Sequence, residues 1–97
     1  MRFVWDPITN DRNLIERHID FAFASLIFGG ATLERLDDLR DYGEARVIAI
    51  GLADGIALTV VYTDRRTGDD VIRRIISARV SNRHEREAYV RLVGSTS

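Results

Sequence analysis

Arginines crowd the last third of the chain. Residues 65 to 97 hold eight of the fourteen arginines and four of the fifteen acids, a net charge of +4, whereas residues 1 to 64 hold six arginines and eleven acids, a net charge of −5. There is no lysine. A guanidinium offers a planar fork of donors that fits a phosphate with two parallel hydrogen bonds. A coding bias explains the absence of lysine equally well, but it does not explain the clustering, which favours a polyanionic ligand such as a nucleic acid.

Size and composition bound the remaining choices. A chain of 97 residues is expected to form a single domain over residues 1–97. Without cysteine there is no disulfide framework and no thiolate metal site, and two isolated histidines are too few for a zinc site, so we expect neither metal nor cofactor. The N-terminus lacks a signal-peptide pattern, and the longest apolar stretch is too short to cross a membrane. We expect a cytoplasmic protein with no membrane contact.

Local signals predict the elements that must position the arginines. Phe3 to Trp5 reads as a strand, and Asp6-Pro7 is an N-cap followed by a proline suited to the first helical position, which predicts a helix to about Arg17. Asp20 precedes a second predicted helix, Phe21 to Phe28. Residues Ala31 to Gly43 show no clean period, so we expect a loop with at most one helical turn.

The second half predicts strands and a final helix. Ala45 to Leu52 and Ile56 to Thr63 flank an Asp54-Gly55 turn typical of a hairpin. A further strand is expected over Val71 to Val80, after the polar turn Asp64 to Asp70, and Asn82 with Glu85 has capping-box spacing at the start of a helix. The predicted class is α+β, an antiparallel sheet with two N-terminal helices packed on one face and a C-terminal helix.

Strand alternation assigns side chains to the two faces of this sheet. One face collects bulky residues that the N-terminal helices cover: Ile48, Ile50, Leu52, Ile56, Leu58, Val60, Tyr62, Ile72, Ile76 and Val80. The other face carries small side chains together with Arg73 and Arg79. Either a nucleic-acid strand or a helix of a partner fits such a floor. Arg74 falls on the bulky face, so it must extend to an edge, pair with a carboxylate or mark a bulge.

Several segments together resemble one known family. They are Trp5-Asp6-Pro7, Asn13-Leu14, Tyr42-Gly43-Glu44, Ile48 to Gly51, Val60 to Thr63, Arg74 to Arg79, and Arg83, Glu85, Arg86 and Tyr89 in the last helix. This set, which covers nearly the whole chain, resembles the BrnT toxins. The resemblance implies a RelE-like fold, endoribonuclease activity in a type II toxin-antitoxin system, and neutralisation by a BrnA-like antitoxin with a ribbon-helix-helix domain, so that DNA is contacted only through the antitoxin.

The chain departs from the family pattern in two places. Thr9 and Asn10 occupy a region where family members commonly have a lysine, and Glu16-Arg17-His18 replaces a Lys-His-Gly tripeptide, with His18 at the position of the glycine. These departures suggest weakened or altered catalysis, or the use of His18 one position displaced. The alternative function is therefore an inactive toxin-fold module that binds the antitoxin and acts as its co-repressor.

Cleavage of RNA without a metal needs a base near the ribose 2′-hydroxyl, positive charge at phosphorus and an acid at the leaving oxygen. Arg79 is the first candidate for the charge, and Arg74 is the second because of the resemblance. The alternative for both is an ion pair with Glu44 or Glu85. We expect the arginines of the last strand and the last helix to converge on one spot, with RNA contacts from Arg65, Arg66, Arg73, Arg83 and Arg86.

Two residues of the last helix complete the candidate catalytic set. Glu85 is either a base, a holder of an arginine or simply a helix cap. Tyr89 either donates a proton or stacks on a base, or it packs on the sheet. His84 and His18 are weighed as bases but ranked below these, because a lone histidine is more often solvated.

Overall fold

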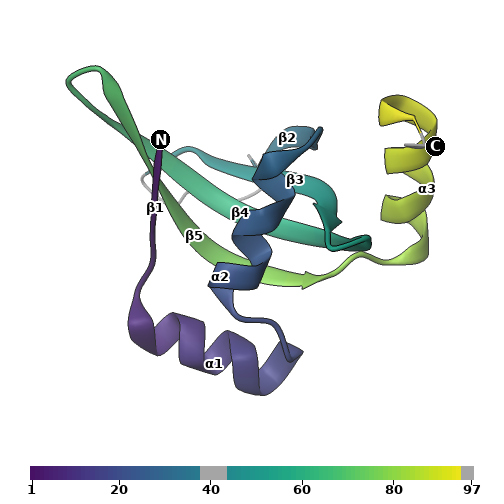
Figure 1. Ribbon diagram of the computed structural model, residues 1–97, viewed down its shortest axis with the longest axis horizontal. Coiled ribbons are helices and arrows are strands. Elements are labelled where there is room, and N and C mark those ends of the chain that lie inside the picture. Colours follow the sequence, from purple (N-terminus) through teal and green to yellow (C-terminus); the bar gives the residue numbers. More distant parts are fainter. Residues whose placement is uncertain (38–43, 95–97) are drawn as a thin grey trace.

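A five-stranded sheet organises the chain (Figure 1). The structure is a computed structural model that describes residues 1–37 and 44–94. The strands lie in the order β1-β5-β4-β3-β2. Their bounds are β1 Arg2–Val4, β2 Leu33–Asp37, β3 Arg46–Ala53, β4 Ile56–Thr67 and β5 Asp70–Val80. The helices are α1 Pro7–Arg17, α2 Phe21–Ala24, the 3₁₀ helix η1 Ser25–Gly29 and α3 Arg83–Val93.

The α+β class is confirmed, but the sheet is mixed rather than antiparallel. β1 pairs with β5 in parallel, with Arg2 opposite Ile72 and Val4 opposite Arg74. The other three pairings are antiparallel. A parallel neighbour needs a long crossover, which here comprises everything between β1 and β5. No local turn signal in the sequence reports such a pairing.

The segment expected to be a loop contains a strand. β2 pairs with β3 over five positions, from Leu33 opposite Ile50 to Asp37 opposite Arg46. β2 is an edge strand rich in charged residues, which blunts an edge against aggregation and hides the alternation of apolar residues. The rest of the expected loop, residues 38 to 43, lies outside the described residues.

Two further boundaries differ from the predictions. The helix predicted over Phe21 to Phe28 is α-helical only to Ala24 and continues as 3₁₀. The polar turn predicted over Asp64 to Asp70 is mostly strand, because β4 runs to Thr67 and β5 begins at Asp70. Only two residues remain in the turn, and Gly68 supplies the positive φ of 62° that it requires. The two strands form a hairpin that projects from one end of the sheet (Figure 1).

The predicted helix starts are confirmed. The Asp6 carboxylate accepts from the backbone N–H groups of Ile8 and Thr9, and Pro7 is the first helical residue. Asp20 accepts from the N–H of Phe23 at 2.8 Å. Asn82 and Glu85 form both hydrogen bonds of a capping box. Side-chain oxygens at these positions satisfy N–H groups that have no partner within the helix.

The two faces of the sheet are not those predicted from alternation. The two-residue Asp54-Gly55 turn pairs Ala53 with Ile56, so odd positions of β3 share a face with even positions of β4. One face therefore carries Val47, Ala49, Gly51 and Ala53 with Leu58, Val60 and Tyr62. We call it the helix face, because α2 and η1 cross it, and the opposite one the open face (Figure 1). Ile48, Ile50 and Leu52 lie on the open face.

Small residues of β3 let η1 approach the helix face closely. A Cβ on Gly51 would lie 2.9 Å from the Ile27 Cβ, which is too close for two carbon atoms. Ala49 and Ala53 beside it are fully buried. The core consequently combines a small-residue strand with fully buried Phe21, Ile27 and Leu58. Ala49 and Gly51, predicted to belong to an open floor, in fact lie beneath η1. The small residues of β4 and β5 in that prediction lie on the open face as expected: Ala57, Thr59, Thr63 and Ser77.

α1 covers an edge of the sheet rather than a face. Beyond Arg74, β5 has no paired strand on its β1 side among the described residues. There the Asn13 side chain takes the place of a strand, since its amide donates to the Ala78 carbonyl at 2.9 Å and its oxygen accepts from the Ala78 N–H at 3.2 Å. It also donates to the Ile19 carbonyl at 2.7 Å. α1 therefore fixes the segment that leads to Arg79.

Candidate functional site

A groove lies where α3 meets the open face. It has a volume of about 520 Å³ and combines an apolar floor with ionisable side chains. Its lining includes Leu33, Ile48, Ile50, Ala88 and Leu92, with Arg35, Arg79, His84 and Glu85. β2, β3, β5 and α3 all contribute. Among the predicted catalytic residues, the groove brings Arg79 and Glu85 together.

Arg79 is held by Glu85 in a two-pronged ion pair. The two terminal guanidinium nitrogens donate to the two carboxylate oxygens at 2.6 and 2.7 Å. The Arg79 side chain remains 40% exposed, whereas that of Glu85 is 15% exposed. The alternative in which Arg79 pairs with Glu85 is thus confirmed as geometry. The pair fixes the guanidinium at the groove while leaving part of it accessible.

Glu85 is committed to its partners. Burial raises the pKa of its carboxyl, but hydrogen bonds from Arg79 and from the Asn82 N–H outweigh burial and hold the pKa below its usual value. A carboxylate with a lowered pKa is a weak proton acceptor. The geometry therefore favours the cap and the arginine holder over the base among the three roles considered for Glu85.

Tyr89 anchors α3. It is 5% exposed, and its hydroxyl donates to the Ala31 carbonyl at 2.9 Å. This contact ties α3 to the segment that precedes β2. The packing alternative for Tyr89 fits this geometry, since a buried ring cannot stack on a base of RNA.

Arg73 lies on the opposite face from Arg79. It lies opposite Asp64 of the neighbouring strand β4 on the helix face, and its guanidinium donates to both Asp64 carboxylate oxygens at 2.8 and 2.9 Å. Its guanidinium carbon stacks 3.9 Å from the centroid of the Tyr62 ring. The predicted placement of Arg73 and Arg79 on one face is wrong. A β-bulge at Val61/Tyr62 shifts the register, so that alternation along β5 reverses between the two arginines.

The same bulge places Arg74 on the open face. Arg74 lies opposite Thr63, and its guanidinium donates to both carboxylate oxygens of Glu44 at 2.7 and 2.9 Å. Two of the alternatives considered for this residue, a carboxylate partner and a bulge, are both present. Arg74 and Arg79 are five residues apart on β5, roughly 15 Å at the rise of a strand. The predicted convergence of the arginines on one spot is therefore wrong.

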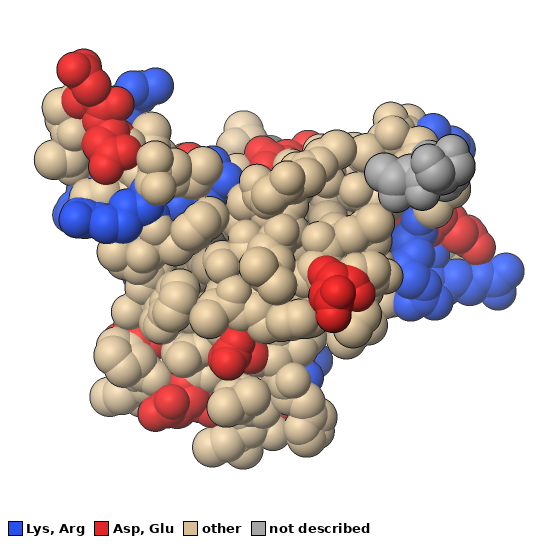
Figure 2. Space-filling view, viewed as in Figure 1, with Lys and Arg blue, Asp and Glu red and all other residues tan. Residues whose placement is uncertain are grey.

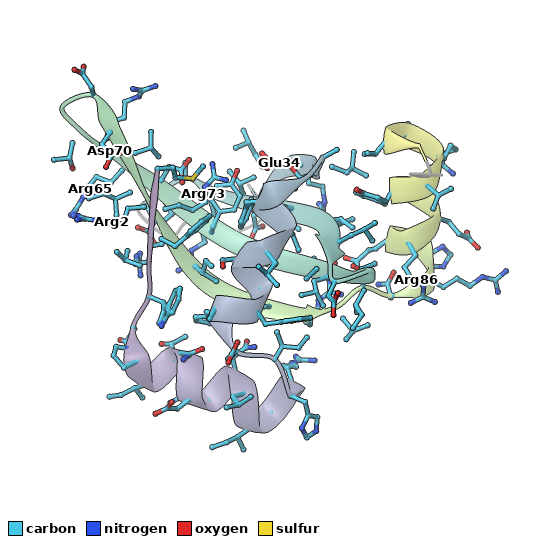
Figure 3. The ribbon with its side chains drawn as sticks, viewed as in Figure 1. Arg2, Glu34, Arg65, Asp70, Arg73 and Arg86 are labelled. Carbon is cyan, nitrogen blue, oxygen red and sulfur yellow. The ribbon has the colours of Figure 1, made fainter. Side chains whose placement is uncertain are left out.

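The other predicted RNA contacts fall into two groups. Arg65 and Arg66 are exposed on the β4–β5 hairpin and, as neighbours on a strand, point to opposite faces. On α3, Arg83 pairs with Glu87 at 2.9 Å, and Arg86 donates to the Ser81 carbonyl at 2.6 Å. Figure 3 places Arg65 and Arg86 at opposite ends of the molecule. Figure 2 shows basic atoms gathered mainly at those two ends, with uncharged surface and several acidic groups between them.

The two histidines differ in their surroundings. His84 lines the groove beside Arg79, as does Arg35, which the sequence did not single out. The signal for Arg35 was masked because β2 was not recognised as a strand. His18 ends α1 with a positive φ of 63°, a conformation open to glycine and tolerated by histidine. It lies with Phe23 and Val80 outside this groove. His18 thus ends the helix in the conformation that the glycine expected there from the resemblance would adopt.

Within residues 1–37 and 44–94, no three histidine, aspartate or glutamate side chains are grouped to hold a metal ion. None of the helices in these ranges is long and apolar enough to cross a membrane.

Comparison with known proteins identifies the family. The family described as the ribonuclease toxin BrnT of type II toxin-antitoxin systems matches residues 5–85, which include the segment from Arg74 to Glu85. A search of curated proteins returned no match. Toxins of such systems act on RNA and have an antitoxin partner. Because the match spans most of the chain and confirms the resemblance, this protein belongs to the BrnT family of type II ribonuclease toxins.

Proposed function

We propose that the protein is an endoribonuclease that cleaves RNA without a metal ion at the groove between α3 and the open face. The observation that carries the proposal is the position of Arg79, which lines this groove with its guanidinium oriented by Glu85 and still 40% exposed. A cation fixed before the substrate arrives stabilises the charge that develops at phosphorus with little reorganisation.

Arg79 retains donors for a phosphate. A guanidinium carries five N–H donors, and two of its terminal nitrogens each use one on Glu85. The remaining donors are available to a ribose-phosphate linkage in the groove. Arg35, on the opposite wall, adds a second positive charge to the same space. The role of Glu85 is to position Arg79.

His84 is the proposed proton-transfer group. It lines the groove with Arg79 and comes from the first turn of α3. Histidine is the residue that most often transfers protons in enzymes. Glu85 is a poorer candidate because its charged form is stabilised by Arg79. Tyr89, which was a catalytic candidate, supports the site by fixing α3.

The α+β class and the mixed five-stranded sheet are compatible with a RelE-like ribonuclease fold, which we propose for this chain. We further propose that the antitoxin is BrnA-like, with a ribbon-helix-helix domain that contacts DNA, and that it inhibits the toxin in the cytoplasm by covering the groove. Its carboxylates would then replace RNA phosphates near Arg79. A structure of the complex with the antitoxin only on α2 and η1 would contradict inhibition by occlusion.

The proposal is tested by incubating the purified protein with single-stranded RNA in the presence of EDTA. Internal cleavage that survives chelation is the expected result, and intact RNA after long incubation, or cleavage only with added metal, would refute it. The products report the position of the cut, which separates endonucleolytic cleavage from trimming of the ends.

A second candidate function is an inactive toxin-fold module that binds the antitoxin and serves as its co-repressor. It is favoured by the departures at Thr9 and at Glu16 to His18, and by the carboxylate partners of Arg73, Arg74 and Arg79. Expression without the antitoxin distinguishes the two functions. Growth arrest supports the ribonuclease, whereas normal growth with soluble, folded protein supports the binding module.

A further inference from the structure

A second hollow lies on the open face, at the end of the sheet away from α3. Its volume is about 190 Å³, and it is lined by Val4, Glu44, Thr63, Arg65, Ile72 and Arg74. Three strands contribute to it, β1, β4 and β5. The groove that holds Arg79 shares none of these residues.

Strand register gathers three arginines around this hollow. Arg2 and Arg65 both pair with Ile72, one from each side, so their Cα atoms are about 10 Å apart in one row across the sheet. Arg74 lies two residues further along β5 on the same face. Figure 3 shows Arg2 and Arg65 close together beside the hairpin. Arg65 and Arg74 therefore line the hollow, and Arg2 lies beside it, paired with Ile72 from the β1 side.

The acids nearby do not neutralise all three cations. Glu44 pairs with Arg74, and Asp70 pairs with the Met1 ammonium at 3.2 Å. Arg2 also contributes to holding the pKa of Asp70 below its usual value, after larger contributions from the Met1 ammonium and the Val71 N–H. Within the described ranges, Arg65 has no carboxylate within ion-pair distance. The hollow thus keeps an excess of positive charge with unused donors.

We infer that Arg2, Arg65 and Arg74 form a second phosphate-binding subsite, which holds a phosphodiester of the same RNA strand about 15 to 25 Å from Arg79. The inference rests on the proposed function, because it takes RNA as the ligand. Arg74 is therefore a substrate-binding residue remote from the cut. Val4, which is partly exposed, gives the hollow an apolar wall suited to contact with a ribose.

The hairpin itself supplies a matched control. Arg65 and Arg66 are adjacent, exposed and equally charged, yet Arg65 pairs with Ile72 on the open face and Arg66 with Val71 on the helix face. A general electrostatic attraction would respond equally to the loss of either residue. A phosphate held in the hollow would be bound more weakly on loss of Arg65 but not of Arg66, so Arg66, which the sequence suggested as an RNA contact, is not part of this subsite.

The test measures binding in an Arg79→Ala background, so that cleavage does not interfere. Fluorescence anisotropy with a labelled single-stranded RNA of about 16 nucleotides, a length within the range of known single-strand sites, is recorded between low and high salt. Arg65→Ala is expected to reduce the magnitude of the slope of log K against log salt by about 0.7. Between 1 M and 0.1 M salt, the affinity of the variant should therefore rise roughly fivefold less than that of the parent. Arg66→Ala is expected to leave the slope within error of the parent. An Arg65→Gln variant should show the same reduction in slope, because it removes the charge while it keeps a long polar side chain.

Equal slopes for the Arg65→Ala and Arg66→Ala variants would overturn the subsite. So would unchanged RNA binding combined with weaker antitoxin binding, which would assign the hollow to the protein partner. Failure of the proposed function is seen separately, as absence of cleavage by the parent protein. A selective effect of Arg65 on RNA binding supports the subsite even then.

Discussion

Arg79 and Glu85 are joined by two hydrogen bonds of 2.6 and 2.7 Å, one to each carboxylate oxygen. Glu85 at the same time accepts from the Asn82 N–H at 2.9 Å, which closes the capping box of α3. The Glu85 side chain therefore caps the start of α3 and also orients the Arg79 guanidinium at the groove. The start of α3 and the position of the proposed phosphate-stabilising group thus depend on the same carboxylate.

Replacement of Glu85 should change how stability depends on pH. Because the folded pKa of Glu85 lies below its usual value, the carboxylate stabilises the fold above that value, and this contribution is lost as the pH falls through the folded pKa. In urea unfolding at pH 7, the free energy of unfolding of Glu85→Gln is expected to be about 1 kcal/mol lower than that of the parent. Its decline from about pH 5 downward should be shallower than in the parent. Glu87→Gln, in an exposed pair with Arg83, is the control and should change little. Parallel pH curves for Glu85→Gln and the parent would argue against the stabilised carboxylate.

Asn13 should be a stability residue with no direct part in chemistry. Asn13→Ala removes three hydrogen bonds and leaves both backbone groups of Ala78 without a partner at the edge of β5. We expect the free energy of unfolding to fall by about 2 to 3 kcal/mol. Arg12→Ala, exposed on the same helix, should stay within about 0.5 kcal/mol of the parent. Similar values for the two variants in chemical denaturation would contradict the strand-like role of Asn13.

Neighbouring arginines on β5 should have separable effects. Arg73→Ala removes a side chain that stacks on Tyr62 and pairs with Asp64, so we expect a loss of about 1 to 2 kcal/mol in stability. RNA affinity should hardly change, because this residue lies on the helix face. Arg74→Ala should instead weaken RNA binding and change the stability little. Thermal denaturation and RNA binding of both variants provide the comparison, and weaker RNA binding by folded Arg73→Ala would mean that the helix face also contacts RNA.

The two histidines should differ in their effect on cleavage. Substitution of His84 by alanine is expected to lower the single-turnover rate by about 10²- to 10⁴-fold, as for loss of a general acid or base, with little change in RNA affinity. His18→Asn keeps a residue that tolerates the positive φ at the end of α1 and should cleave at the parent rate. The opposite ranking would place proton transfer at His18, the displaced position suggested by the family pattern.

Local chemistry made much of the fold predictable. Asp6, Asp20 and Asn82 mark helix starts because each has a side chain that accepts from N–H groups a few residues ahead. The Asp54-Gly55 pair marks a hairpin because both residues adopt positive φ. The pairing of β1 with β5 depends on residues about 70 positions apart, and no local pattern reports it.

The site was harder to predict because faces depend on register. A two-residue turn exchanges the parity of the strands that it joins, and the bulge at Val61/Tyr62 exchanges it again along β5. The turn moved Ile48, Ile50 and Leu52 to the open face, and the bulge alone moved Arg73 to the helix face and Arg74 to the open face. Arg79 was singled out because it lies near the end of the last strand, and Glu85 because it has capping-box spacing from Asn82, while Arg35 was missed with its strand.

The most direct test of the account is the rate at which purified protein cleaves a defined single-stranded RNA in EDTA, compared among the parent, Arg79→Ala and Arg12→Ala. Arg79→Ala leaves Glu85 without its partner and should unfold about 4 to 8 °C below the parent, whereas Arg12→Ala, exposed on α1, should unfold with the parent. The rates are therefore compared at a temperature at which all three proteins are folded. The account predicts a rate about 100-fold or more lower for Arg79→Ala, with Arg12→Ala unchanged. Cleavage by folded Arg79→Ala at the parent rate would contradict it.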